Sequence, residues 1–240
     1  LLEALGLPAP CYGHLALIVG ADGGPLSKRA GDLSLRELRA QGYLPEALLN
    51  YLARLGHAYE RDVWMEPTEL ATGFSTEHLG RAPARFDGAQ MLHWQSEAVQ
   101  RATSERLWDW MGAAVREQVP PDRSEELIAT IRPNVRFPAD ALFWAERLFG
   151  ADLTPSADSQ AVIVAAGSQF FVHALAAYDR HGAAYQPLVD ELRQRTGVKG
   201  KGLFMPLRAA LTGEIHGPEL GRILHLLPPE TVHHRLQACC

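Results

Sequence analysis

The sequence is short of cysteine and of long apolar runs, and both shortages exclude classes of protein. Its 240 residues contain three cysteines, of which Cys239 and Cys240 are adjacent. Such a set makes no disulfide framework, which excludes the small disulfide-stapled secreted class and predicts a cytoplasmic location. No apolar run approaches the roughly 18 residues that a membrane span needs, so we expect no membrane partner.

Ligand spacings typical of zinc sites and lysine residues are scarce as well. The densest group of potential ligands is His233, His234, Cys239 and Cys240, but its spacing matches no common zinc pattern, so we expect no metal site. The chain has only three lysines against twenty arginines, and its net charge is −5. That charge argues mildly against a nucleic-acid-binding protein, although a local cluster of cations can still bind phosphate.

What is present is typical of a globular, mainly α protein. Hydrophobic residues make up 47% of the chain and charged residues 21%, and this length suffices for one large or two small domains. Helical patterns cover residues 103–119, 122–131 and 138–149. One long helix, from about Ala157 to Arg180, is apolar nearly all round and is expected in the middle of a bundle.

The first stretch whose residue types indicate a chemical function is the loop at residues 20–29. A strand-like run, residues 14–19, leads into a turn rich in glycine, and Ser27, Lys28 and Arg29 follow that turn. Glycine lets backbone amides approach an anion closely, while the three side chains donate to phosphate oxygens. The pattern predicts a phosphate-binding loop, with an ordinary basic surface turn as the alternative.

Two short helices are expected directly behind this loop. Ser34 and Glu37 have the spacing of a capping box at the start of the first helix, and Pro45 opens the second. Further along, Trp94 is expected in the core. The predicted apolar face of the second helix consists of four leucines, Leu48, Leu49, Leu52 and Leu55, and the two residues expected to face outward beside the tryptophan are His93 and Gln95.

A second loop, residues 196–202, places two of the three lysines before a helix. Lys199 and Lys201 alternate with glycine and run into a helical pattern at 203–213. Two ammonium groups and the free amides of a helix N-terminus make an anion site. A flexible surface loop is the alternative.

Both loops resemble parts of one family. Residues 25–29, with Gly31 and segment 37–56, resemble the second signature motif of class I aminoacyl-tRNA synthetases in its bacterial glutamyl form. Segments 199–213 and 217–220 resemble the helical anticodon-binding domain that closes that enzyme. The family motif usually reads Lys-Leu-Ser-Lys-Arg, whereas this chain reads Pro25-Leu26-Ser27-Lys28-Arg29, so Pro25 replaces the first lysine.

The resemblance implies a ligase that attaches glutamate to tRNA through glutamyl-adenylate, using ATP with Mg²⁺, and that acts as a monomer. Lys28 would be the catalytic residue that stabilises the ATP phosphates. Residues 1–100 would hold the end of the catalytic region, with the signature loop and a domain that contacts the tRNA stem, and residues 101–240 the helical anticodon-binding domain. The nucleotide-binding catalytic fold would lie upstream of Leu1, so we expect this fragment alone to be inactive.

The resemblance also implies contacts with a glutamate-accepting tRNA. It places the anticodon-reading loop at Gly217, Pro218 and Leu220, and an anticodon-reading arginine at Arg132 or Arg136. The position of Arg132 is also typical of a cation at a helix end. The residues expected to contact backbone phosphates are four cations, Arg193, Arg195, Lys199 and Lys201.

Two other hypotheses stay open from the sequence. One is a stand-alone tRNA-binding module without ligase activity, and the other is a helical scaffold with no RNA role. Within the ligases, the glutaminyl enzyme is disfavoured because its family ends in β-barrels, whereas this chain ends in helices. The truncated paralogue that modifies a tRNA base lacks the helical domain, so it is disfavoured too.

Overall fold

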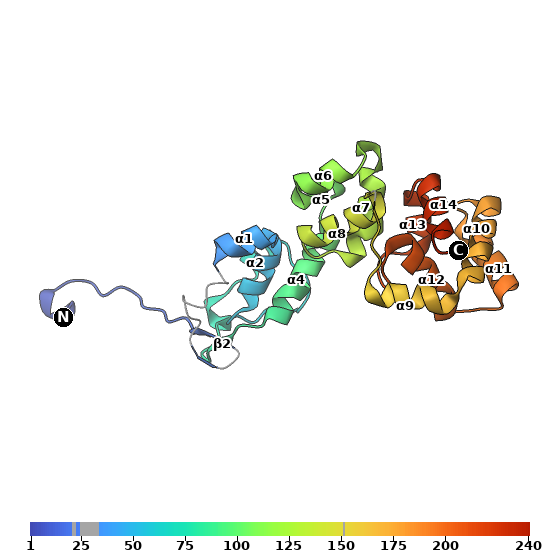
Figure 1. Ribbon diagram of the computed structural model, residues 1–240. Coiled ribbons are helices and arrows are strands. Elements are labelled where there is room, and N and C mark those ends of the chain that lie inside the picture. The colour runs from blue at the N-terminus through green and yellow to red at the C-terminus, as the bar shows by residue number, and fades with distance from the viewer. Residues whose placement is uncertain (21–22, 25–33, 151) are drawn as a thin grey trace. The chain divides into compact units, whose positions relative to one another are not determined.

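The structure is a computed structural model that describes residues 1–20, 23–24, 34–150 and 152–240 (Figure 1). The signature motif, residues 25–29, lies outside the described residues. Within them the chain forms fourteen α-helices and one sheet of two short strands, so the mainly α prediction is confirmed. The chain divides into two compact units, Leu1–Ala98 and Val99–Cys240.

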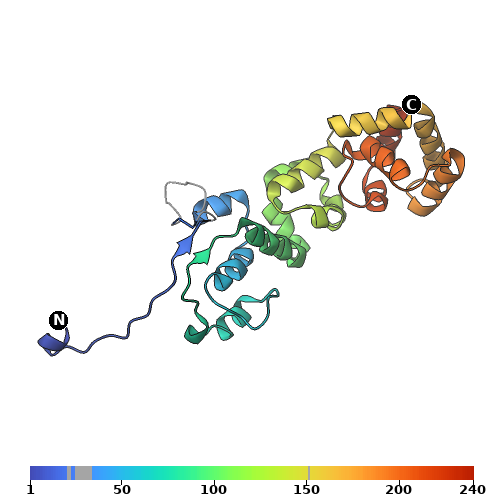
Figure 2. The same cartoon turned by 90° about the horizontal axis from the view of Figure 1, so that it is seen from below.

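The first unit combines a two-stranded parallel sheet with short helices. Strand β1 (Ile18–Val19) pairs with β2 (Ala84–Arg85), so only the end of the predicted run 14–19 is a strand. Residues 7–17 form an extended segment before β1 (Figure 2). The other elements are η1 (Glu3–Leu5), α1 (Leu35–Gln41), α2 (Pro45–Arg54), α3 (Pro67–Thr72), η3 (Thr76–His78) and α4 (Gly88–Arg101), which crosses the division between the units.

A buried glutamine holds the corner between α1 and α2. Ser34 and Glu37 form the predicted capping box, and Gly42 ends α1 with a φ of 96°. Gln95 of α4 is fully buried: its Oε1 accepts from the Leu44 N–H at 2.9 Å, and its Nε2 donates to the Gly42 carbonyl at 3.2 Å. The prediction that Gln95 faces outward is wrong, because the buried turn leaves two backbone groups that need polar partners.

The buried face of α2 also differs from the predicted one. Leu49 and Leu52 are 46% and 47% exposed, whereas Asn50 and Tyr51 are buried. The Asn50 amide donates to the Met65 carbonyl at 2.9 Å, and its oxygen accepts from the Met65 N–H at 3.0 Å. The polar groups of the neighbouring segment therefore decide which side of α2 turns inward, and the leucine stripe prediction is wrong for these two residues.

The second unit is helical throughout its described residues. Helix α10 packs against α11 and α14, and α12 packs against α9. Fully buried side chains from nearly every helix, among them Leu107, Ile131, Leu148, Phe171 and Leu207, form its core. The elements are α5 (Ser104–Met111), α6 (Ala113–Gln118), η4 (Pro121–Arg123), α7 (Ser124–Ile131), η5 (Arg132–Asn134), α8 (Pro138–Phe149), α9 (Ala157–Ala166), α10 (Ser168–His181), α11 (Tyr185–Thr196), α12 (Lys201–Thr212), α13 (Leu220–Leu226) and α14 (Pro229–Gln237).

Glycines break two of the predicted helices. Gly112, with a φ of 90°, separates α5 from α6, and Gly167, with a φ of 76°, separates α9 from α10. Because α9 and α10 meet at 87° and Val164 of α9 is 75% exposed, the prediction of one long helix in the middle of a bundle is wrong. In the described part of the chain no single helix is long and apolar enough to cross a membrane, although this bent pair passes the same test together.

The Gln95 contacts give the first testable prediction. We expect Gln95→Leu to lower the free energy of unfolding by about 1–3 kcal/mol, because the substitution removes the hydrogen bonds that the Gln95 side chain makes with the buried Gly42 carbonyl and Leu44 N–H. The measurement is urea unfolding of the 240-residue chain. His93→Gln, on the exposed side of the same helix next to the buried core residue Trp94, is the control. Equal stability of the two variants would contradict this account.

Candidate nucleic-acid interface

A phosphate-binding loop is predicted in the first unit. The structure describes only the residues on either side of its motif. On the N-terminal side, the Gly20 N–H donates to the Gly24 carbonyl at 2.7 Å and the Gly23 N–H donates to the Gly20 carbonyl at 3.0 Å, with Gly23 at a φ of 81°. On the C-terminal side, Ser34 begins α1. The motif residues themselves, Pro25, Leu26, Ser27, Lys28 and Arg29, lie outside the described residues, so their roles stay predictions.

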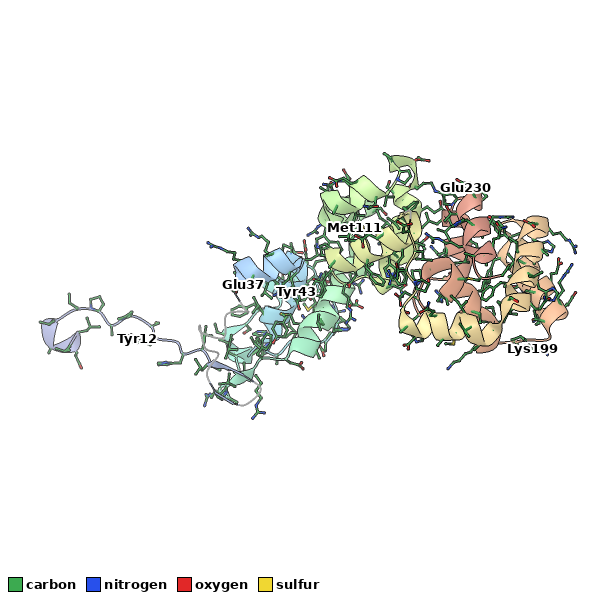
Figure 3. The ribbon with its side chains drawn as sticks, viewed as in Figure 1. Tyr12, Glu37, Tyr43, Met111, Lys199 and Glu230 are labelled. Atoms are coloured by element: carbon green, nitrogen blue, oxygen red, sulfur yellow. The ribbon has the colours of Figure 1, made fainter. Side chains whose placement is uncertain are left out.

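The second predicted loop brings its two lysines to the start of α12. Gly197 ends α11 with a φ of 70°, and Gly200 begins α12 with a φ of 58°. Lys199 and Lys201 are both exposed, and Lys199 is labelled on this loop in Figure 3. Within the described residues neither ammonium has an ion-pair partner. The two charges are therefore available to an anion at this helix N-terminus.

The arginines predicted to bind phosphate beside this loop already have acidic partners. Arg193 donates to Asp190 at 2.6 Å, and Arg195 lies 2.7 Å from Glu191. Arg180, at 3.0 Å, and His181, at 2.7 Å, contact the same Glu191 carboxylate. Burial opposes the charge of Glu191, but the His181 hydrogen bond and the two guanidinium groups outweigh it and lower its pKa. Because two guanidiniums share one carboxylate, this network still carries positive charge.

Arg132 binds the end of a helix. One guanidinium nitrogen donates to the carbonyls of Gln100 at 3.1 Å and Ala102 at 2.9 Å, where α4 ends. The Gln100 side chain donates in return to the Arg132 carbonyl at 2.9 Å. Arg136 is exposed, and its backbone N–H donates to Asp140 at 2.9 Å. These contacts support the interpretation of Arg132 as a cation at a helix end. A base-reading role for Arg132 or Arg136 stays a prediction.

The predicted anticodon-reading residues lie on one loop between α12 and α13. Gly217 has a φ of 144° and packs against the indole of Trp144 on α8. Pro218 is buried, and its carbonyl accepts a hydrogen bond from Arg208 on α12. Leu220, the first residue of α13, is only 3% exposed. The structure thus brings these three residues together and directs Leu220 into the core.

Three side chains that the sequence did not single out hold this loop. They are Trp144, Arg147 and Arg208, and the Arg147 Nε donates to Glu214 Oε1 at 2.9 Å. Burial lowers the pKa of Arg208, and the neighbouring Tyr185 partly offsets this shift. Trp144 and Arg147 are three positions apart on α8, so they share one side of that helix, but nothing in the sequence indicated which segment they contact.

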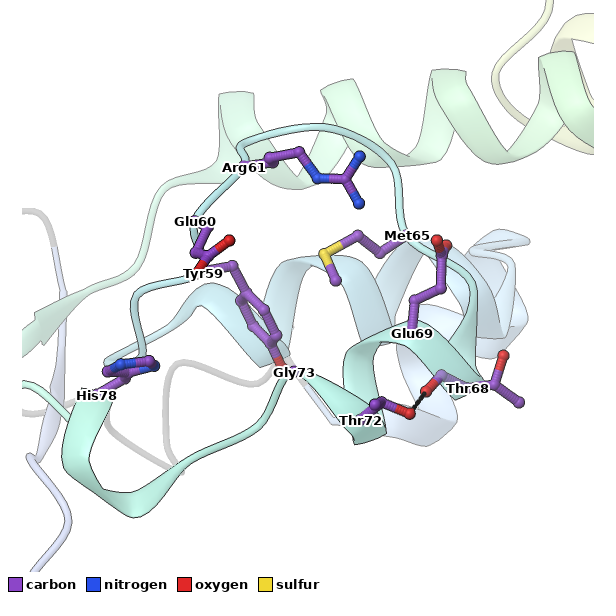
Figure 4. A pocket seen from close by; sticks show the side chains of 9 residues that line it. All are labelled: Tyr59, Glu60, Arg61, Met65, Thr68, Glu69, Thr72, Gly73 and His78. Atoms are coloured by element: carbon purple, nitrogen blue, oxygen red, sulfur yellow. Dashed lines mark hydrogen bonds between the residues drawn. The ribbon is translucent and has the colours of Figure 1, made fainter.

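A pocket of about 480 Å³ lies in the first unit, between α3, η3 and residues 59–65 (Figure 4). Its lining mixes an aromatic ring, Tyr59, with charged side chains such as Arg61 and Glu69. The Tyr59 hydroxyl already donates to the Leu70 carbonyl at 3.0 Å. Across the described ranges no three histidine, cysteine or carboxylate side chains are grouped to hold a metal ion.

Comparison with known proteins supports the interpretation of both units. The family described as tRNA synthetases class I (E and Q), catalytic domain, matches residues 1–94, and the anticodon binding domain family matches residues 103–240. The helical fold and these two matches together place the chain among the class I tRNA synthetases. The crystal structure of the glutamate-tRNA synthetase from Elizabethkingia anophelis has the same fold, with a TM-score of 0.83 at 22% identity over 99% of this chain and 52% of that one.

The curated relatives narrow the class. Glutamate–tRNA ligase 2 of Nitrosococcus oceani is 53% identical over 100% of this chain and 51% of its own length, and glutamate–tRNA ligase 1 of Halorhodospira halophila is 48% identical over 99% and 49%. The chain belongs to the glutamate–tRNA ligase family, as the resemblance predicted. It spans about half the length of the curated relatives it matches.

The close approach of Gly217 to Trp144 gives a second prediction. A Cβ on Gly217 would lie 2.6 Å from Cζ2 of Trp144, so we expect Gly217→Ala to cost about 2–4 kcal/mol of unfolding free energy from overpacking and backbone strain together. Gly197→Ala is the matched control, because Gly197 also has a positive φ but no atom within 4 Å of its Cβ position. If the two variants unfold at the same urea concentration, the Trp144 contact is not tight.

Proposed function

We propose that this chain binds glutamate-accepting tRNA and supplies the ATP-motif loop of a glutamate–tRNA ligase. The observation that carries the proposal is the arrangement along α12. Exposed Lys199 and Lys201 stand at its start, and the Gly217 loop stands just past its end. A helix of 12 residues is about 18 Å long, a span that a folded RNA loop can bridge.

The two ends of α12 suit different parts of an RNA. Ammonium groups and helix N-terminal amides bind phosphates without regard to sequence, and they supply affinity that weakens with salt. Unpaired bases are recognised by stacking and by hydrogen bonds to their edges, which require a surface held in one shape. Phosphate binding is therefore proposed for Lys199 and Lys201, with Arg193 and Arg195 nearby, and base recognition for the loop at Gly217.

For the chemical step, we propose that Lys28 neutralises charge on the ATP phosphates, with Ser27 and Arg29 in support. The substrates of the whole enzyme would be glutamate, tRNA and ATP with Mg²⁺. Because Pro25 stands where the family has a lysine, more of the charge neutralisation falls on Lys28.

We propose different roles for the two parts of the chain. Residues 1–100 would contribute the end of the catalytic region and the contact with the tRNA stem, and residues 101–240 the anticodon contact. We also propose that the fragment alone is inactive, because it contains no His-x-Gly-His motif, and that the whole enzyme is a cytoplasmic monomer.

The role of Lys28 is tested in the whole enzyme. We expect Lys28→Ala to slow glutamyl-adenylate formation by orders of magnitude, because a charge-neutralising group is removed, while the Kd for tRNA stays nearly unchanged. ATP–pyrophosphate exchange measures the first quantity and filter binding the second. Arg36→Ala, an exposed cation on α1, is the control. Unchanged exchange in Lys28→Ala would refute the catalytic role.

The role of the lysine loop is tested by a salt series with the 240-residue chain. We expect Lys199→Glu with Lys201→Glu to weaken binding to glutamate tRNA, and to reduce the slope of log K against log salt by about 0.7–0.9 for each phosphate that the variant no longer neutralises. Lys199→Arg with Lys201→Arg keeps both charges and should keep the slope. A slope that does not change on charge reversal would show that these lysines do not contact phosphate.

A further inference from the structure

We propose that Trp144 and Arg147 of α8 are positioning residues that hold the loop from Gly213 to Glu219 in the conformation that reads the anticodon. This inference rests on the proposed function. The two residues are three positions apart, so they share one side of α8, and both contact the loop. None of the comparisons assigns them a role.

The first contact is steric. Gly217 has a φ of 144°, and its Cα side is filled by the Trp144 ring, so no side chain fits between them. Trp144 is 6% exposed and meets Phe143 edge to face at 5.2 Å, which fixes the orientation of the indole. The Trp144 ring therefore sets the distance between the loop backbone at Gly217 and α8.

The second contact is an ion pair shielded from water. The side chains of Arg147 and Glu214 are each 21% exposed, and the Arg147 guanidinium also lies 4.0 Å from the centroid of the Phe143 ring. Cation–π contact and hydrogen bond together leave the guanidinium one orientation. Glu214, and with it the first half of the loop, is fixed relative to α8.

Helix α12 and its neighbours also hold parts of the same loop, and Thr212 Oγ1 at the end of α12 accepts from the Glu214 N–H at 3.2 Å. The Gly213 carbonyl accepts from the Ser156 N–H at 2.9 Å, and the Pro218 carbonyl accepts from Arg208. His216 and Glu219 stay exposed between and beside these contacts. Without α8, Gly217 would lose its contact with Trp144 and Glu214 its ion pair with Arg147, and RNA binding would then have to offset the entropy of ordering this part of the loop.

This arrangement predicts that loss of the α8 contacts changes the discrimination between anticodons but not the salt dependence of RNA binding. Removal of the α8 contacts should reduce discrimination between anticodons, because base recognition needs an ordered loop. It should leave the salt slope unchanged, because Lys199 and Lys201 stand at the other end of α12. If Trp144 and Arg147 only stabilised the fold, their loss would not change anticodon discrimination separately from the salt slope.

The test uses the 240-residue chain, glutamate tRNA and a version of that tRNA with a changed anticodon. For Arg147→Met and for the conservative Glu214→Gln we expect the ratio of the two Kd values to fall about tenfold, with the salt slope of binding retained. The double variant Arg147→Glu with Glu214→Arg should recover part of the ratio. Arg116→Met, which removes an arginine from the same unit far from the loop in sequence, should leave it unchanged.

The outcomes separate this inference from the function it rests on. A wild-type chain that binds both tRNAs equally would overturn the proposed function and the positioning role together. A wild-type chain that discriminates, with both single variants folded by circular dichroism and still discriminating fully, would overturn the positioning role alone. A fall in the ratio together with a fall in salt slope would also overturn it, because the contacts would then serve the bundle as a whole.

Discussion

Short helices leave many backbone carbonyls without partners within the helix, and arginine side chains bind several such carbonyls in this protein. The last four carbonyls of a helix have no donor within it, and a guanidinium can reach two at once. Arg123 donates at 2.8 Å to each of the carbonyls of His225 and Leu226, where α13 ends. Burial lowers the pKa of Arg235 to about 10, yet it stays charged at neutral pH and donates to Leu211 at 2.6 Å. Other arginines that bind carbonyls are Arg54, Arg116, Arg132, Arg208 and Arg222.

The binding of backbone carbonyls by arginine gives a physical reason for the excess of arginine over lysine in this sequence. These guanidinium groups serve the fold, so the number of arginines overstates the charge that is open to a ligand. Lys199 and Lys201 are different, because they are exposed and unpaired within the described residues. The two lysines of the second unit are therefore more accessible to an anion than the arginines that bind carbonyls.

The sequence predicted local features well and long-range contacts poorly. The capping box at Ser34, the start of α8 at Pro138 and the loop before α12 follow from residues a few positions apart. The break at Gly167 was missed because an apolar helical pattern continues on both sides of it, and a glycine alone does not fix its φ. Gln95 was misplaced because its partners lie 51 and 53 residues away.

The candidate site shows the same limit. Family resemblance predicted an anticodon-reading loop at Gly217, but it did not indicate the helix that contacts this loop, since Trp144 is distant in sequence. Hydrogen exchange of the 240-residue chain with an anticodon stem-loop RNA of glutamate tRNA tests most directly whether RNA contacts both ends of α12. We expect slower exchange at residues 199–204 and 213–219 when the RNA is bound. Unchanged exchange in both segments, with binding observed, would contradict it.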